Sequence, residues 1–160
     1  MPVSTRIEEV RSEIAALAQA APTAKELMQR VCQLMHERML KYNWVGFYML
    51  EPGARPPMLV LEAFVGAMTP HTRIPLNQGI CGAAASSGKT IVVDDVSKDP
   101  RYLACSLETK SEIVVPVFVG GQVAGELDID SHFASAFGIE DQQLVQYCAE
   151  VVGKRLEQSQ

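Results

Sequence analysis

The chain has 160 residues, 48% of them hydrophobic, a length and composition that predict one compact domain over 1–160. Its formal net charge is −5 and it has no basic run, which argues against a nucleic-acid partner. The first twenty residues, MPVSTRIEEVRSEIAALAQA, carry acids throughout and no long apolar stretch, so we expect no leader, no membrane span and a cytoplasmic location.

Two amphipathic helices are predicted at the start of the chain. Apolar residues recur at helical spacing from Ser4, and they do so again after the segment APTAKE. The first series is Ile7, Val10, Ile14 and Leu17, and the second is Leu27, Val31 and Leu34, with Met28, Cys32 and Met35 beside it. We therefore expect helices over 1–41, followed over 42–160 by a sheet, a pocket and a closing helix.

The rest of the chain alternates strand and turn signals. NWVGFYML (43–50) and MLVLEAFVG (58–66) flank the loop EPGARPP, and IPLNQG (74–79) is turn chemistry leading into a short alanine-rich helix that ends at Gly88. Strands TIVV and EIVVPVFV follow, the latter joined to QVAGELDID through two glycines, and a last helix begins near Ile139. This order indicates an α+β fold, an antiparallel sheet with helices mainly on one side.

The four cysteines fall into two classes. Cys32 and Cys148 lie on apolar helical stripes, where free cysteine usually packs as a small hydrophobe. Cys81 falls in the first turn of the short helix, where the helix dipole favours a thiolate, and Cys105 follows the irregular stretch DVSKDPRYLA. Together they are either a redox pair or small core residues. No CxxC occurs and the three histidines are scattered, so we expect no metal site.

A run of acids marks the strand GELDIDS. Strand alternation places Glu126, Asp128 and Asp130 on one face. They are either the solvated face of a two-sided sheet, or a carboxylate cluster that binds an amino group or shares a proton. A strict two-residue turn would put Glu112 on the opposite face, so its inclusion requires a bulge near Pro116 or another register.

One face of the first strand carries Trp44 and Tyr48 with Gly46 between them. Core packing explains such aromatic residues, and the wall of a small-ligand pocket explains them equally.

Several sequence blocks carry a family resemblance. NWVGFY, RIPLNQGICGAAA, VDDV, LACS, SEIVVPV and GELDIDS, in this order, resemble the free methionine-(R)-sulfoxide reductase family, which is built on the GAF domain fold. The resemblance runs from about Asn43 to the last helix. It implies a GAF-like central antiparallel sheet, with the N- and C-terminal helices packed on one face and a ligand pocket on the other. It also implies reduction of free methionine sulfoxide, recycling by thioredoxin and no bound cofactor.

The resemblance also assigns residues. Its catalytic cysteines fall on Cys105 and Cys81, and its substrate-binding residues fall on Trp44, Tyr48, Glu112, Asp128 and Asp130. A thiolate attacks the sulfoxide sulfur, a carboxyl protonates the oxygen, and a second thiol converts the resulting sulfenic acid to a disulfide. We expect Cys105 to attack and Cys81 to resolve, with the reverse order open.

One geometric expectation tests this assignment, and one departure from the family pattern leaves an alternative open. A working pair requires Cα atoms of Cys81 and Cys105 within about 7 Å, or a mobile connection over 97–109 that brings them together. The family's third cysteine, just before RIP, is absent: the segment here reads VGAMTPHTRIP, with His71 near that place. The alternative is therefore a non-catalytic GAF module that binds a small molecule. The sequence leaves monomer and homodimer open.

Overall fold

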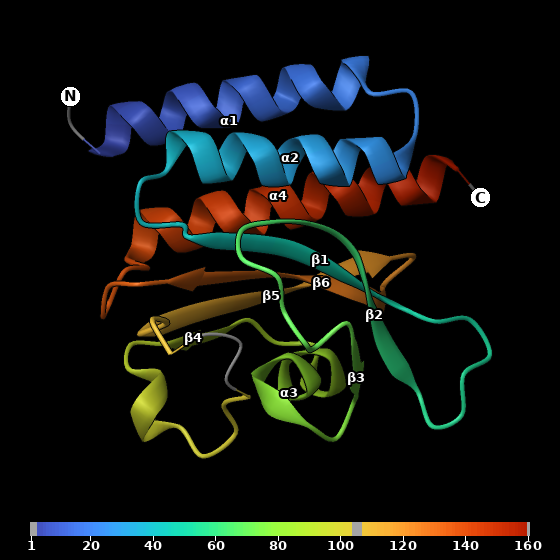
Figure 1. The fold of residues 1–160 in the computed structure, drawn as a ribbon. Helices are drawn as coiled ribbons and strands as arrows, with labels where there is room; N and C mark the ends of the chain where they lie inside the picture. Colours follow the sequence, from blue (N-terminus) through green and yellow to red (C-terminus); the bar gives the residue numbers. More distant parts are fainter. Residues whose placement is uncertain (1–2, 104–106, 160) are drawn as a thin grey trace.

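The computed structural model describes residues 3–103 and 107–159. Within these residues, an antiparallel sheet of six strands in the order β3-β2-β1-β6-β5-β4 lies between two layers (Figure 1). Three long helices, α1, α2 and α4, cover one face, and the short helix α3 with its flanking loops lies against the other. The predicted α+β fold, with the terminal helices on one face of an antiparallel sheet, is confirmed.

The helices and strands have the following bounds. The helices are α1 (Val3–Ala20), α2 (Ala24–Arg38), α3 (Gly79–Ser87), the 3-10 helix η1 (Val96–Lys98) and α4 (Ile139–Gln158). The strands are β1 (Trp44–Leu50), β2 (Met58–Val65), β3 (Arg73–Pro75), β4 (Ile91–Val93), β5 (Ser111–Val119) and β6 (Gln122–Ser131). None of the described helices combines the length and the apolar character needed to cross a membrane.

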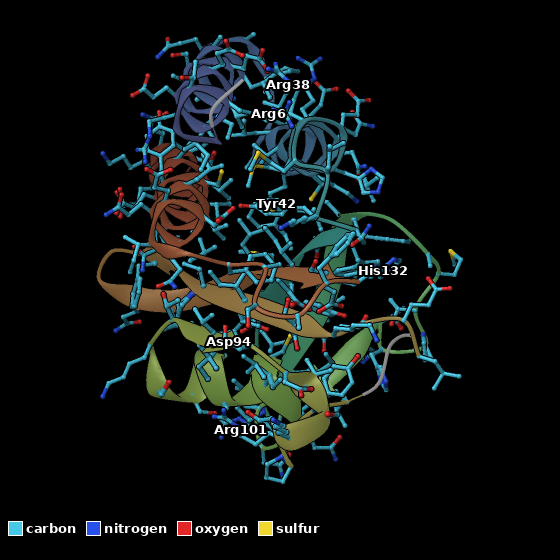
Figure 2. All side chains as sticks on the ribbon, turned by 90° about the vertical axis from the view of Figure 1, so that its left-hand side faces the viewer. Arg6, Arg38, Tyr42, Asp94, Arg101 and His132 are labelled. Atoms are coloured by element: carbon cyan, nitrogen blue, oxygen red, sulfur yellow. The ribbon has the colours of Figure 1, made fainter. Side chains whose placement is uncertain are left out.

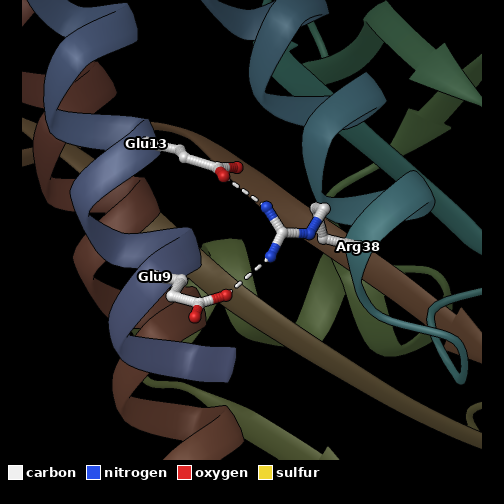
Figure 3. A network of polar contacts seen from close by, with 3 residues as sticks. All are labelled: Glu9, Glu13 and Arg38. Carbon is white, nitrogen blue, oxygen red and sulfur yellow. Dashed lines mark hydrogen bonds and ion pairs between the residues drawn. The ribbon is translucent and has the colours of Figure 1, made fainter. Parts of the chain in front are cut away.

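The main core lies between the sheet and the three long helices. The apolar stripe of α2 is buried there, and its first turn is capped by Thr23, whose side chain accepts a hydrogen bond from the Glu26 amide at 3.1 Å. Arg38 at the end of α2 pairs with Glu9 and Glu13 of α1 and so ties the two helices together (Figure 3).

Cys32 and Cys148 are buried in this core, as predicted. Burial raises the pKa of the Cys148 thiol to about 12. Tyr42, labelled in Figure 2, also belongs to the core, and its hydroxyl donates to Asp141 of α4 at 2.6 Å.

The hairpin of β5 and β6 sets the register of these two strands, which decides the side chains that face α3. Val119 pairs with Gln122 across Gly120 and Gly121, whose φ angles of 58° and 78° need a residue without a Cβ. The register then shifts by one residue between Val117 and Phe118. The bulge expected near Pro116 is thus present next to it.

Two short elements were not predicted. Residues 74–79 were expected to be turn chemistry only, but Ile74 and Pro75 belong to β3, which pairs with the start of β2 at the edge of the sheet. The 3-10 helix η1 was also missed. Each has three residues, too few for a hydrophobic period to show in the sequence.

Candidate functional site

The face of the sheet under α3 carries buried acids. Strand β6 alternates, so that Leu127 and Ile129 enter the main core while its acids face α3. Glu126, Asp128 and Asp130 are 0%, 2% and 2% exposed. The solvated-face interpretation is therefore wrong, because these carboxyls have been removed from water.

Glu112 of β5 completes a cluster of four carboxyls. It lies opposite Asp130 in the β5–β6 register and is 5% exposed. Without the bulge it would lie opposite Ile129 and face the other way. The hairpin therefore decides whether this acid belongs to the site.

Burial raises the pKa of each carboxyl in this cluster. Removal from water raises the pKa of Glu112, Glu126 and Asp130 well above their usual range, and the charge of Asp128 adds to each rise. Burial also raises the pKa of Asp128, but contacts with Glu112 and Cys81 oppose that rise.

Cys81 lies directly over this cluster. It is in the first turn of α3, 5% exposed, and its thiol donates to Asp128 Oδ2 at an S–O distance of 3.4 Å. The sequence predicted a thiolate stabilised by the helix dipole, and in this structure that prediction is wrong. Burial, and then the charges of Asp128 and Glu126, raise the pKa of Cys81 well above its usual value.

The start of α3 depends on a glycine. Gly79 has a φ of +72°, and a Cβ there would lie 2.8 Å from Leu103 Cδ1. The close approach lets Leu103 cover the first turn of the helix, next to Cys81.

An aromatic wall stands beside the acids on β1. The Trp44 and Tyr48 ring centroids are 6.2 Å apart, and Trp44 stacks on Phe64 at 5.8 Å with 20° between the planes. Both polar atoms are anchored to backbone, since Trp44 Nε1 donates to Ala67 O at 3.1 Å and the Tyr48 hydroxyl donates to His71 O at 2.7 Å.

Gly46 makes this arrangement possible. A Cβ at this position would meet Trp44 Cη2 at 2.4 Å, so only glycine lets the indole lie across the strand. Gly46 is therefore needed for the aromatic wall, whether the wall serves core packing or lines a ligand pocket.

A small cavity lies among these groups, with about 20 Å³ of free space, room for a single water molecule. The described residues that line it are Tyr48, His71, Ile74, Gly79, Ile80, Cys81, Leu103, Glu112 and Asp128. Four of the predicted site residues therefore share one cavity, while Trp44 and Asp130 are buried beside it. Cys105 lies outside the described residues. The predicted distance between the Cα atoms of Cys81 and Cys105 therefore stays a prediction.

Three residues of this region escaped the sequence-based assignment. His71 had been noted only as standing near the missing cysteine, and Leu103 had no signal at all, because neither belongs to a periodic pattern. Glu126 was recognised as sharing the face but not as lying against Cys81, since strand alternation does not show which helix covers the strand.

The donor set of the cavity suits a cation. Ligand atoms of Cys81, Glu112 and Asp128 all lie within 4.8 Å of one another, and all three residues are buried. Among the described residues that line the cavity there is no Lys or Arg. Both a protonated amine and a metal ion are cations of the kind that these carboxylate oxygens and this sulfur can bind.

The profile of the GAF domain family matches residues 23–156. This chain belongs to the GAF domain family. Solved structures similar to it include a type II free methionine-R-sulfoxide reductase from Thermoplasma acidophilum. It is 41% identical, the match covers 89% of this chain and 96% of that one, and the TM-score is 0.79. A free methionine-R-sulfoxide reductase from Neisseria meningitidis, solved in complex with its substrate, is 33% identical, covers 99% of this chain and 93% of its own, and has a TM-score of 0.92.

A curated relative gives the same result. The free methionine-R-sulfoxide reductase of Escherichia coli is 39% identical over 110 residues, which are 69% of this GAF chain and 64% of that protein. Within the GAF family the chain therefore belongs with the free methionine-R-sulfoxide reductases. The resemblance seen in the sequence blocks is confirmed.

Proposed function

We propose that this GAF domain protein reduces free methionine-(R)-sulfoxide to methionine, using Cys105 and Cys81 as its thiols and a thioredoxin as reductant. The observation that carries the proposal is the closed site, where buried carboxyls, a thiol and an aromatic wall meet. Similar proteins that are named free methionine-R-sulfoxide reductases support it.

The carboxyls meet two needs of the substrate. A free amino acid brings an ammonium group, which a buried ionised carboxylate binds strongly, and Asp128, which lines the cavity, is our candidate for this contact. The sulfoxide oxygen must gain protons as its bond to sulfur breaks, and the carboxyls held neutral by burial can supply one. Glu112 and Asp130 are the candidates for that role.

The aromatic residues suit the remaining part of the substrate. Trp44 and Tyr48 offer an apolar surface for the methyl and methylene groups, held in place by their backbone hydrogen bonds. The carboxyl cluster beside that surface would select the free amino acid, because an amide nitrogen within a polypeptide carries no ammonium charge.

The two thiols complete the reaction. The thiolate of one attacks the sulfoxide sulfur, methionine leaves, and the sulfenic acid that remains condenses with the other thiol to a disulfide and water. Two hydrogens from a dithiol then restore both thiols. We assign Cys105 as nucleophile and Cys81 as the resolving thiol, whose proton Asp128 is placed to accept.

The cavity must open for this to happen. Its 20 Å³ of free space cannot hold methionine sulfoxide. Leu103 and His71 line it from segments without helix or strand structure, and the described part of 97–109 includes Leu103. Outward movement of these segments would expose Cys81 and the acids without disturbing the sheet.

The test is a coupled assay with thioredoxin, its reductase and NADPH, run separately on the R and S epimers of free methionine sulfoxide. We expect NADPH consumption with the R epimer alone, loss of it in Cys105→Ser and Cys81→Ser, and normal consumption in the matched control Cys148→Ser. Equal rates on both epimers would contradict the proposal. Binding of the R epimer by calorimetry with no NADPH consumption would instead establish the alternative, a GAF module that binds without turnover.

A further inference from the structure

Three donor atoms meet at the cavity under α3. The Cys81 sulfur and one carboxyl oxygen each from Glu112 and Asp128 lie within 4.8 Å of one another. The distance between Cys81 Sγ and Asp128 Oδ2 is 3.4 Å. Sulfur and oxygen ligands of one zinc ion lie about 3.5 Å apart, given the usual zinc–ligand bond lengths. The sulfur and Asp128 already have that spacing, and a side-chain adjustment of about 1 Å brings in Glu112.

The carboxyl of Asp128 points to a ligand independently of this spacing. Asp128 is 2% exposed and lines the cavity, and its Oδ1 has no hydrogen-bond partner among the described residues. Glu112 lines the same cavity and is 5% exposed. A buried carboxyl oxygen without a donor destabilises the fold, and a bound cation removes that cost.

The size of the cavity favours an ion in the closed form of the protein. Its free space of about 20 Å³ holds one water molecule, and a bare divalent metal ion is no larger. Methionine sulfoxide enters only when the cavity opens. The closed form therefore has room for a metal ion and not for the proposed substrate.

The sulfur atom selects the kind of ion. Mg²⁺ and Ca²⁺ take oxygen ligands, whereas a thiolate beside two carboxylates suits Zn²⁺. The ionised Cys81, Glu112 and Asp128 together carry three negative charges, and no Lys or Arg is among the described residues that line the cavity. A divalent ion offsets two of these charges, which a single ammonium group does not.

We propose that Cys81, Glu112 and Asp128 form a Zn²⁺ site that holds the protein in an inactive form. On binding, the thiol and any protonated carboxyl release their protons to solvent, and a zinc–sulfur bond forms without a change of oxidation state. The ion occupies the proposed resolving thiol and the carboxylate that we place on the substrate's ammonium group. The inhibition rests on the proposed function, and the metal site does not.

Cysteine and histidine spacing does not reveal such a site. The expectation of no metal site rested on the missing CxxC and the scattered histidines. The three ligands come instead from α3, β5 and β6, and the bulge in the hairpin turns Glu112 to the face of Asp128. The proposal therefore departs from that expectation because two of the ligands are carboxylates.

The first measurement uses Co²⁺ as the probe, because a cobalt–thiolate bond gives a charge-transfer band in the near ultraviolet. The reduced, metal-free wild type should show this band at one ion per chain. Cys81→Ser should abolish it, and Asp128→Asn and Glu112→Gln should each weaken Zn²⁺ binding at least about tenfold by calorimetry. The matched controls Cys148→Ser and Glu62→Gln, the latter at an exposed position, should change neither the band nor the affinity.

The second measurement uses the wild type alone, so it does not depend on the folding of any variant. Alkylation of Cys81 and Cys148 by iodoacetamide is followed by peptide mass spectrometry with and without Zn²⁺. Saturating Zn²⁺ should slow the alkylation of Cys81 at least about tenfold, because the metal-bound sulfur is no longer a free nucleophile. Cys148 in the main core should keep its rate, and Mg²⁺ should protect neither thiol.

The third measurement tests the inhibition. The reduced wild type is mixed with the R epimer in a single turnover without thioredoxin. One equivalent of Zn²⁺ should slow methionine formation at least about tenfold, and EDTA should restore it. Excess R epimer should raise the Zn²⁺ concentration that gives half-inhibition, since both ligands need Asp128.

Four results overturn the inference: no cobalt band in the wild type, a band that survives in Cys81→Ser, protection by Mg²⁺ equal to that by Zn²⁺, or full methionine formation by the zinc-loaded protein. Failure of the proposed function looks different, because the metal-free wild type would then form no methionine. The first two measurements would still decide the metal site in that case.

Discussion

The two faces of strand β6 bury side chains of opposite chemistry, apolar on one face and acidic on the other. On one side Leu127 and Ile129 are fully buried among apolar side chains from three helices. On the other, Glu126, Asp128 and Asp130 are just as buried, and each has at least one carboxyl oxygen without a partner. The same degree of burial therefore stabilises the fold on one face and opposes it on the other.

The sulfur atoms repeat this contrast. Cys148 packs against Met35 at 3.9 Å in the main core. Cys81 donates to a carboxylate under α3. Buried acids and a buried thiol destabilise the fold, and proteins keep such groups where a reaction needs them away from water. The apolar core on the opposite face of the sheet then supplies the stability.

The largest effect is expected on the apolar face. Leu127→Ala removes a fully buried side chain and should lower the free energy of unfolding by about 3 kcal/mol, because the cavity that it leaves cannot fully collapse. Urea unfolding measures this change. Leu40→Ala, the same substitution at a side chain that is 77% exposed, is its control and should change stability by at most about 0.5 kcal/mol. Similar losses of unfolding free energy in Leu127→Ala and Leu40→Ala would show that burial on the apolar face of β6 is not what stabilises the fold.

The polar face should show its effect in catalysis. Asp128→Asn removes the carboxylate that we place on the substrate's ammonium group and on the Cys81 thiol, so it should raise KM as well as lower kcat. Asp130→Asn removes a candidate donor of the sulfoxide proton and should lower kcat about a hundredfold while KM changes little. Steady-state kinetics with the R epimer separate these outcomes. Wild-type kinetics in both variants would remove the acids from the mechanism.

The cost of the buried acids should be visible as pH changes. Since the folded-state pKa of Glu112 is raised above its usual 4.5, its contribution is most favourable at low pH and is lost as the pH rises toward the folded value. Glu112→Gln should therefore be more stable than the wild type at pH 8 and close to it at pH 4. Urea unfolding at the two pH values tests this. A variant less stable at pH 8 would show that the acid stabilises the fold.

The smallest effect is expected at the surface. The Arg38 network of Figure 3 joins α1 to α2, but its members are about one third to two fifths exposed. Arg38→Gln should lower Tm only slightly, and the difference should shrink in high salt because exposed ion pairs are screened. A large, salt-independent loss of Tm would show that this pairing matters as much as the core.

The sequence predicted much of the fold because its signals are local. Helical spacing located α1, α2 and α4, and strand alternation put the three acids of β6 on one face. The bulge in the β5–β6 hairpin was one of two alternatives, the other being a different register, that would let Glu112 share that face. Short elements such as β3 were beyond reach, since three residues contain no period.

The site was less predictable, because its chemistry depends on what covers it. Alternation could not distinguish a solvated row of acids from a buried one; the position of α3 makes the difference. For the same reason the helix dipole gave the wrong direction for the pKa of Cys81, because burial and then the acidic neighbours outweigh the dipole. Such effects arise between segments distant in the chain, and single-sequence patterns do not contain them.

The aromatic wall gives this protein an optical reporter of its own site. Trp44 is the only tryptophan in the chain, 6% exposed, and its ring centroid is 6.2 Å from that of Tyr48 on the cavity. Indole emission shifts with the polarity and the quenching groups around it. Fluorescence excited at the red edge of the absorption band therefore comes from the polar face alone, and it would follow the entry of a sulfoxide, the loss of methionine and the opening of the cavity in real time without a label.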